Sequence, residues 1–268
     1  MISYSSKKKW IIIVIAVVVI VLLFVINYRR LLNEDIVFGT KFEIDSLQNV
    51  EQQEIEEQSP VIVYKRYGNL VNILEKDDSF LVDLKYATTD NFMGVVMYGN
   101  VDGAYLQMEV AQMLAEAHSF LKSINAELRI LIYDAVRPLT VQQKMWDHVK
   151  GTPYHRYVAP PERLSLHNFG AAVDLTLADW HGTPLDMGTP FDFFGRAAGI
   201  TDEQLLIEQG VLNRQQVKNR QLLRQVMHHA GFRSISGEWW HFNACSLREA
   251  KQKYTLIETD FTEYVSEN

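Results

Sequence analysis

Residues 166–175, LHNFGAAVDL, constrain the local fold more than any other stretch of this sequence. His167 and Asp174 lie seven positions apart, and mostly small residues and one glycine, Gly170, separate them. On an α-helix the two side chains would lie about 10 Å apart along the axis, and on one straight strand they would face opposite sides. They can meet only if the chain reverses between them, and Gly170 is the residue that permits such a turn.

The spacing alone leaves two interpretations of this stretch open. It is either a tight turn into a strand with two incidental polar residues, or a turn that brings a loop histidine and a strand aspartate to one point. A histidine and an aspartate by themselves are weak evidence for a metal site, so other parts of the chain must decide.

A second polar pair occurs in SGEWWHF, residues 236–242, where Glu238 and His241 flank two tryptophans. A surface salt bridge would explain the pair. The tryptophans, however, predict an apolar surface that excludes water. Polar groups buried against such a surface are costly unless they have a partner or a function. Together with His167 and Asp174, this pair gives two histidines and two carboxylates. Three of these four groups could bind a metal ion, and one carboxylate would remain free. That set is typical of a catalytic zinc site, which needs three protein ligands, an open position for water and a general base.

The N-terminal region contains an unbroken apolar run, WIIIVIAVVVIVLLFVI at residues 10–26, between KKK and NYRR. A helix of this length spans roughly 25 Å at about 1.5 Å per residue. We predict a basic cytoplasmic tail at 1–9 and an uncleaved transmembrane signal-anchor at 10–28. A signal peptide is the alternative, but no small-residue cleavage site follows. The lysines before the run place the rest of the chain outside the cytoplasmic (inner) membrane, in the periplasm.

Composition divides the remainder of the chain. Residues 29–60 are rich in Glu and Gln and predict an acidic stalk or linker. Residues 61–268 predict one folded domain, and the composition of the whole chain, 47% hydrophobic and 22% charged, is typical of globular proteins. Five of the 26 basic residues and none of the 33 acidic residues lie before residue 31. The acidic remainder excludes a nucleic-acid binder, which needs clustered Lys and Arg.

Apolar periodicity predicts a mixture of strands and helices. Strands are expected at residues 61–67, within 79–88, and at 127–138, 171–177 and 232–242. Helices are expected at residues 103–122, 140–149 and 215–230. Thr140 and Gln143 form a possible capping box, and Gly231 is a C-terminal helix stop. Because strands and helices alternate without a strict βαβ repeat, we expect an α+β fold with a central antiparallel sheet flanked by helices.

In combination these motifs resemble the zinc D,D-peptidases, and most closely the D-alanyl-D-alanine dipeptidases known from vancomycin-resistance operons. S-x-H-x-x-G-x-A-x-D runs from Ser165 to Asp174, and E-x-W-H runs from Glu238 to His241. Further supporting stretches are VDLKYATTDNFMG at 82–94, YDAVRPLT at 133–140 and DMGTPFDFF at 186–194. The resemblance covers residues 80–245.

The resemblance implies a zinc dipeptidase domain at 61–268 that holds one Zn²⁺ per chain. It implies that the metal ligands are His167, Asp174 and His241. It implies that the catalytic base is Glu238 and that Arg137 stabilises the transition state. It also implies that Asp192 holds the free amino group of the substrate and that Ser165 lies near the substrate.

We therefore expect hydrolysis of the dipeptide D-alanyl-D-alanine to two D-alanines, in cell-wall peptide metabolism at the membrane. The relatives from resistance operons lack an anchor, so a scavenging or wall-remodelling role is expected here instead of resistance. A D,D-carboxypeptidase acting on muropeptides is an alternative. An acidic residue that binds a free amino group, however, would serve no purpose for a long substrate. A non-catalytic binding module is a second alternative, and the presence of Glu238 and Arg137 favours catalysis.

Overall fold

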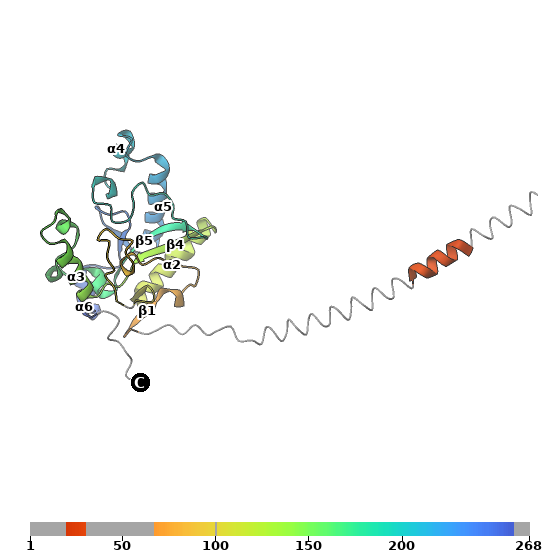
Figure 1. The fold of residues 1–268 in the computed structure, drawn as a ribbon, viewed down its shortest axis with the longest axis horizontal. Coiled ribbons are helices and arrows are strands. Elements are labelled where there is room, and N and C mark those ends of the chain that lie inside the picture. Colours follow the sequence, from red (N-terminus) through yellow and green to blue (C-terminus); the bar gives the residue numbers. More distant parts are fainter. Residues whose placement is uncertain (1–19, 31–66, 100, 260–268) are drawn as a thin grey trace, which may run out of the picture. The chain divides into compact units, whose positions relative to one another are not determined.

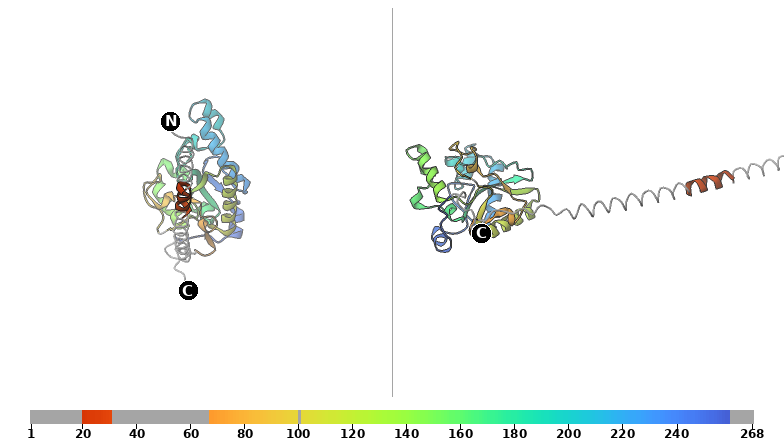
Figure 2. Two further views of the ribbon diagram at one scale, coloured as in Figure 1. Left: turned by 90° about the vertical axis from the view of Figure 1, so that its right-hand side faces the viewer. Right: turned by 60° about the horizontal axis from the view of Figure 1, so that its bottom comes forward.

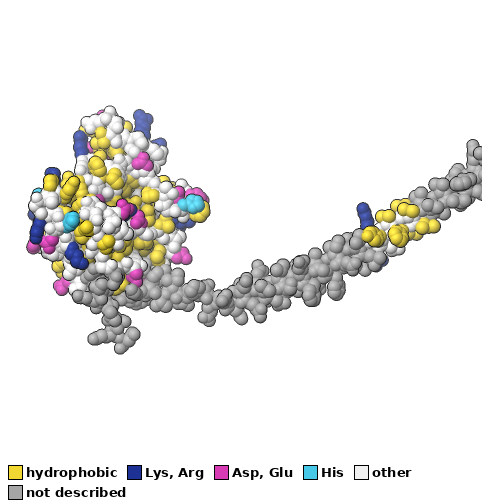
Figure 3. Space-filling view, in the orientation of Figure 1, with side chains coloured by type: hydrophobic (Ala, Val, Ile, Leu, Met, Phe, Trp, Pro, Cys, Tyr) yellow, Lys and Arg dark blue, Asp and Glu magenta, His cyan; other side chains and the backbone are white. Residues whose placement is uncertain are grey.

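The computed structural model describes residues 20–30, 67–99 and 101–259, which belong to two units, residues 1–63 and 64–268. In the first unit, residues 20–30 are helical, and apolar side chains such as Phe24, 73% exposed, cover much of the helix surface (Figure 3). Among the described residues, no helix is both long and apolar enough to cross a membrane. The tail at 1–9, most of the anchor at 10–28 and nearly all of the stalk at 29–60 lie outside the described residues.

The second unit is built on a five-stranded sheet with the strand order β2-β4-β5-β7-β6. Its neighbouring strands β4 and β5 are labelled in Figure 1. Its strands are β2 (Leu81–Val82), β4 (Leu128–Asp134), β5 (Ala172–Asp179), β6 (Arg233–Ser234) and β7 (His241–Asn243). All neighbours are antiparallel except β2 and β4, which are parallel. A separate antiparallel pair is formed by β1 (Leu70–Asn72) and β3 (Tyr105–Gln107). The predicted α+β class is confirmed, and the sheet departs from the predicted antiparallel arrangement at its β2 edge.

The described part of this unit also contains helices of both types. The α-helices are α2 (Met108–Ile124), α3 (Leu139–Val149), α4 (Glu203–Glu208), α5 (Arg214–His229) and α6 (Leu247–Lys253). The 3-10 helices are η1 (Ile73–Glu75), η2 (Lys85–Ala87), η3 (Pro153–Tyr157), η4 (Pro161–Arg163), η5 (Leu166–Phe169) and η6 (Arg196–Ala198). Figure 2 shows the domain from two further directions, with α2 in yellow-green and α5 in blue.

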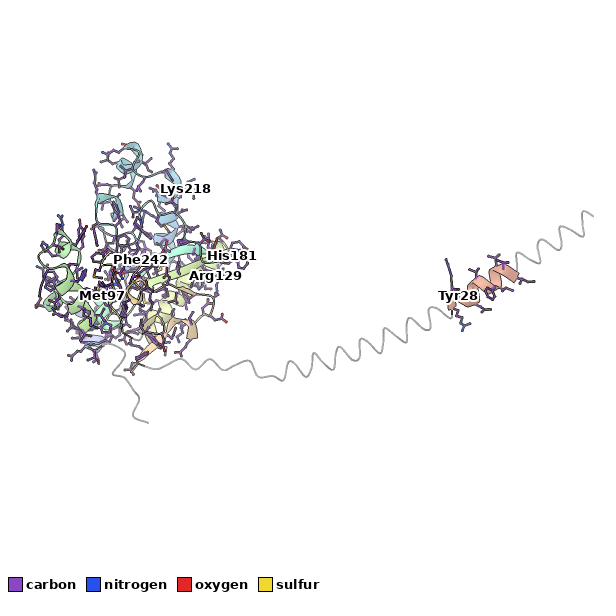
Figure 4. All side chains as sticks on the ribbon, in the orientation of Figure 1. Tyr28, Met97, Arg129, His181, Lys218 and Phe242 are labelled. Carbon is purple, nitrogen blue, oxygen red and sulfur yellow. The ribbon has the colours of Figure 1, made fainter. Side chains whose placement is uncertain are left out.

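The core lies between the sheet and the helices α2 and α5, which pack against each other. Alternate residues of β5, Val173, Leu175 and Leu177, are fully buried in this core, as their spacing predicts. Phe242 of β7, labelled in Figure 4, is also fully buried. Since side chains alternate along a strand, Asp174 is left to face the other side of the sheet.

Two predicted elements differ from the observed ones, and a third lies largely outside the described residues. The helix expected at 103–122 begins only at Met108, because the preceding residues form β3 and pair with β1. The strand expected at 232–242 is instead a hairpin of β6 and β7, whose connecting loop carries Glu238. Of the strand expected at 61–67 only Tyr67 is described, and it forms an isolated bridge with Leu70.

The capping box expected at Thr140 is wrong. Helix α3 begins at Leu139 after Pro138, without a side-chain cap. The backbone N–H groups of Leu139 and Thr140 instead donate to the carbonyls of Ile257 and Glu258, at 2.8 and 3.0 Å. A distant segment of the chain therefore satisfies the free donors at this helix start, and a local motif is not needed.

Candidate active site

The turn predicted at Gly170 is present and positions His167. Ser165 Oγ accepts a hydrogen bond from the His167 N–H, 3.3 Å, at the start of η5, and Gly170 ends this helix with a left-handed φ of 63°. A Cβ at Gly170 would lie 3.0 Å from Leu70 Cδ2 and 3.3 Å from the Gln107 backbone nitrogen. Glycine is required here by both backbone conformation and space, and the chain then enters β5.

Three side chains converge at the end of this turn. His241 of β7 lies directly opposite Asp174 of β5 in the sheet register, and η5 supplies His167. Asp174 Oδ1, His241 Nδ1 and His167 Nε2 form a triangle with sides of 2.9, 3.3 and 3.5 Å. Ligands at about 2.0–2.1 Å around a tetrahedral zinc ion are separated by roughly 3.3 Å. Among the described residues, this is the one group of His, Cys, Asp and Glu that could hold a metal ion.

The outer nitrogens of the two histidines have acceptors of their own. His167 Nδ1 lies 2.6 Å from the carbonyl oxygen of Ala135, and His241 Nε2 lies 2.8 Å from Asn243 Oδ1. These oxygens hold the ring protons on the outer nitrogens and orient both rings. When both rings are neutral, His167 Nε2 and His241 Nδ1 therefore present lone pairs toward Asp174. The donor set, its spacing and its supporting contacts all fit one zinc ion.

Protonation of the ligand set opposes metal binding. Burial alone would lower the pKa of His241, but the hydrogen bond to Asp174 raises it to about 9. Burial alone would raise the pKa of Asp174, but His167 and His241 hold it well below its usual range. A proton on His241 Nδ1 must therefore leave before this atom can bind a metal ion.

All seven residues implied by the sequence motifs line one cavity of about 150 Å³: Arg137, Ser165, His167, Asp174, Asp192, Glu238 and His241. Glu238 lies in the β6–β7 loop, three residues before His241. Burial raises the pKa of Glu238, and Asp174 raises it further, while His241 and Arg137 act in the opposite direction. A carboxyl group with a raised pKa beside a metal site can serve as an acid–base group.

Arg137 follows β4 and is almost fully buried in the cavity wall. Its Nε and Nη2 donate to Asp134 Oδ2, the former at 2.8 Å, and its Nη1 donates to Gln142 Oε1 at 3.2 Å. Its guanidinium lies 5.0 Å from the centre of the Tyr86 ring, and Nη2 lies 3.6 Å from Asp174 Oδ2. Burial opposes the charge, but Asp134 in particular raises the pKa of Arg137 well above its usual value. The guanidinium is therefore a fixed positive charge beside the metal ligands.

Asp134 is a supporting residue that the motif analysis did not single out. It is fully buried, and besides Arg137 it accepts a hydrogen bond from the Tyr98 hydroxyl, which also lies 2.9 Å from the Val136 carbonyl oxygen. A buried carboxylate is costly unless it is paired and hydrogen-bonded. The position of Asp134 three residues before Arg137, at the end of an apolar strand, is the sequence signal that could have identified this pair.

Asp192 also lines this cavity and has a left-handed φ of 57°. The buried Tyr86 hydroxyl lies 3.1 and 3.0 Å from the two carboxyl oxygens of Asp192 and donates to this group. Burial and the neighbouring Asp174 raise the pKa of Asp192 well above its usual value, and Tyr86 partly offsets this. A cationic group placed beside Asp192 would stabilise its ionised form.

A larger cavity of about 890 Å³ borders the same segment. Phe92, Asp192 and Phe194 line both cavities, so the segment around Asp192 forms part of the wall of each. The small cavity alone contains the metal ligands and Glu238.

Comparisons with known proteins agree with this site. A family model described as D-ala-D-ala dipeptidase matches residues 69–260. A D-alanyl-D-alanine dipeptidase of Escherichia coli strain K12 is 34% identical over 185 residues, which cover 69% of this chain and 87% of that protein. A D-alanyl-D-alanine dipeptidase of Synechocystis is 32% identical over 169 residues, which cover 52% of this chain and 68% of that protein.

A solved structure of a vancomycin-resistance D,D-pentapeptidase in complex with Zn(II) is 14% identical, with a TM-score of 0.29. The match covers 58% of this chain and 81% of that one, and this similarity is too low to carry an argument. The family match and the E. coli relative do not depend on it. Because the family match extends over most of the chain and contains every residue of the cavity described above, the chain belongs to the D-alanyl-D-alanine dipeptidase family.

Proposed function

We propose that this protein is a zinc peptidase that hydrolyses the free dipeptide D-alanyl-D-alanine to two D-alanines. One observation carries the proposal: a single cavity of about 150 Å³ brings together all the groups that the reaction needs. These are the three candidate metal ligands, the carboxyl group of Glu238, the fixed guanidinium of Arg137 and a second acidic group, Asp192. Pockets for drug-sized ligands are larger, about 300–1,000 Å³. Membership of the dipeptidase family supports a substrate of the size that this cavity can hold.

The residues of the cavity divide the chemistry between them. Zinc, held by His167, Asp174 and His241, would lower the pKa of a bound water and polarise the scissile carbonyl. Glu238 accepts the proton of the attacking water and returns it to the amine that leaves. The raised pKa of Glu238 suits both steps, because the group must take up a proton and release it near neutral pH.

Arg137 opposes the negative charge that develops on the carbonyl oxygen. Its bonds to Asp134 and Gln142 use three of the five N–H groups of a guanidinium, so it can still donate into the cavity. Because these bonds fix the guanidinium before substrate binds, little reorganisation is needed in the transition state.

Asp192 and Tyr86 provide the selection for a free amino group. The substrate ammonium would pair with the Asp192 carboxylate, which Tyr86 orients from the other side. A longer peptide or an acylated dipeptide lacks this charge and would leave the carboxylate buried and unpaired. Ser165 lines the cavity, and its hydroxyl already accepts from the His167 N–H. We therefore assign Ser165 a place beside the substrate and no separate chemical step.

The first experiment compares the wild-type protein with Glu238→Ala on D-alanyl-D-alanine, with zinc content measured for both. The variant should keep its metal and lose activity by about 10²–10⁴-fold, the usual contribution of a general base. Activity near the wild-type level in a zinc-loaded variant would contradict the role of Glu238.

The second experiment compares the free dipeptide with its N-acetyl derivative. Acetylation removes the ammonium and should abolish measurable turnover. Efficient hydrolysis of the acetylated compound would instead favour a D,D-carboxypeptidase that acts on longer peptides.

For the N-terminal part of the chain we propose a basic tail at 1–9, a membrane anchor at 10–28 and a linker at 29–60, with the catalytic domain at 61–268 in the periplasm. The apolar run at 10–26 and its flanking charges support this topology. An enzyme in that position would meet dipeptide released by cell-wall turnover. Protease added to intact spheroplasts should digest the catalytic domain, and protection of the domain would place it in the cytoplasm.

A further inference from the structure

Asp192 lies in a loop, residues 187–199, which we call the Asp192 loop and which has no regular structure apart from η6. The left-handed φ of 57° at Asp192 is a conformation that residues with a side chain rarely adopt. Such a conformation is strained and persists where the surrounding structure holds it. The loop therefore needs contacts that hold it in place.

One buried side chain contacts both ends of the Asp192 loop. Arg220 of α5 is fully buried, and its Nε donates to the Met187 carbonyl oxygen at 2.6 Å, where the loop begins. Its Nη2 donates to the Ala197 carbonyl oxygen at 2.9 Å, and its Nη1 lies 3.4 Å from that of Gly199, where the loop ends. A planar guanidinium with donors in several directions can bridge two chain segments in this way.

Arg220 is one member of a polar row on α5, the helix on which Lys218 is labelled in Figure 4. Gln216 Nε2 donates to Asp186 Oδ2 at 2.9 Å, and Asn219 Nδ2 donates to the Asp186 carbonyl oxygen at 2.8 Å. Positions 216, 219 and 220 share one helix face because of their spacing. This face of α5 therefore binds the chain from Asp186 into the beginning of the loop.

A second set of contacts connects the loop with the hairpin that carries Glu238. Trp239 Nε1 donates to Thr189 Oγ1 at 2.8 Å, and the Trp239 backbone N–H donates to the Ala198 carbonyl oxygen at 3.0 Å. The Arg220 guanidinium lies 5.9 Å from the centre of the Trp239 ring. The loop is thus held between α5 and the residue next to the catalytic carboxyl.

We propose that Arg220 is a positioning residue for substrate recognition, which closes the base of the Asp192 loop and so holds Asp192 at the substrate amine. The inference rests on the proposed function, in which Asp192 pairs with the ammonium of the dipeptide. Arg220 does not line the small cavity; its hydrogen bonds go to the loop carbonyls, and its guanidinium also lies near the Trp239 ring and 3.8 Å from Glu203 Oε1. When the base of the loop opens, Asp192 can leave its strained conformation and its contact with Tyr86. The zinc ligands and Glu238 lie on other elements and stay in place.

The test measures kcat, KM, zinc content and melting temperature for the full-length, zinc-loaded protein. Arg220→Lys keeps the positive charge but cannot span both ends of the loop. We expect it to retain zinc and to raise KM for D-alanyl-D-alanine by about 10-fold or more, with kcat changed by less than about 3-fold, since hydrogen bonds from charged groups have effects of this size.

Lys218→Met is the matched control. Lys218 lies two residues before Arg220 on α5, but its side chain is exposed. KM should stay within about 2-fold of the wild-type value, as for surface substitutions away from special features. Thr189→Val is a second, milder variant that removes the Trp239 acceptor without leaving a buried charge. It should raise KM in the same direction by a smaller factor.

A double-mutant cycle with Asp192→Asn separates positioning from general stability. If Arg220 acts through Asp192, Arg220→Lys should add little to the KM of Asp192→Asn. Unchanged KM in Arg220→Lys, beside a raised KM in Asp192→Asn, would overturn the inference and leave the proposed function intact. Parallel losses of kcat, zinc and melting temperature in Arg220→Lys would also overturn it. An unchanged KM in Asp192→Asn would refute the role of Asp192 in the proposed function, and that of Arg220 with it.

Discussion

The metal ligands and the Asp192 loop meet at one cavity, but different interactions hold them. Asp174 and His241 face each other across the β5–β7 ladder, and main-chain bonds around Gly170 present His167. Asp192 instead lies in an irregular loop whose base is bound by the side chain of Arg220. Main-chain register thus builds the candidate metal centre, whereas side chains distant in sequence build the proposed recognition site. Single substitutions should therefore affect substrate recognition without disturbing the metal centre.

Removing a metal ligand gives the largest expected effect. His241→Ala leaves two ligands, and its zinc affinity should fall by more than about 100-fold, because losing only an outer hydrogen-bond partner already costs about 10–100-fold. Zinc content after dialysis and dipeptide turnover should both fall to background. Stoichiometric zinc in this variant would show that the triangle of ligand atoms is not the metal site.

Two asparagine substitutions compare the regions directly. Asn243→Ala removes the acceptor of His241 Nε2 and should weaken zinc binding by about 10–100-fold in a chelator competition. Asn219→Ala removes a donor to Asp186, next to the Asp192 loop, and should leave zinc affinity unchanged. Equal effects of the two variants on zinc would contradict the division between the regions.

Gly170→Ala tests the backbone that presents His167. The substitution should lower the free energy of unfolding by about 1–3 kcal/mol, since it places a Cβ at positive φ and against Leu70. Gly182→Ala is the control, because Gly182 also has a positive φ, 91°, but its added Cβ would have open space. Urea unfolding should show the larger loss for Gly170→Ala, and equal losses would mean that crowding at the turn is unimportant.

The smallest expected effect concerns pH and a group on α2, His118, which lines neither cavity. Burial lowers the pKa of His118 from 6.5 to about 4, against the attraction of Asp77, whose Oδ2 lies 3.3 Å from its Nδ1 without hydrogen-bond alignment. The unfolded chain therefore takes up a proton below pH 6.5 that the native chain does not. The stability that depends on neutral His118 is complete above pH 6.5 and is lost as the pH falls toward 4.

The loss should be roughly 1 kcal/mol per pH unit in this range. His118→Phe keeps an aromatic ring against Phe80 and should flatten the decline in melting temperature between pH 7 and 5. The same slope in the variant would assign the acid sensitivity to other groups, with the metal ligands as the first to consider.

The parts of the site that depend on local properties could be predicted from the sequence. The reversal at Gly170 followed from helix and strand geometry, and the alternation along β5 separated core residues from Asp174. The motifs and their order identified seven residues that line one cavity. The alternation of strand residues alone did not predict that these seven side chains meet. Asp134 was missed although its spacing from Arg137 is visible in the sequence, because its hydrogen bond from Tyr98, 36 residues away, forms only in the folded chain.

Contacts between distant segments account for what was wrong or missing. The start of α3 was predicted from a local capping motif, but carbonyls near residue 257 satisfy its N–H groups. Arg220 could not be singled out, since polar residues cover much of α5 and a polar helix face is normally solvated. Arg220 becomes buried only in the folded chain, where the Asp192 loop packs over it.

The α+β class, the turn at Gly170 and the residue types of a zinc site could be predicted from the sequence, because periodicity, backbone freedom and ligand chemistry are properties of short stretches. The family was indicated by the resemblance of several motifs in order. The triangle of ligand atoms, the pairing of Arg137 with Asp134 and the closure of the Asp192 loop by Arg220 appear only in the folded chain. These depend on strand register and on hydrogen bonds between segments tens of residues apart, which no local pattern specifies.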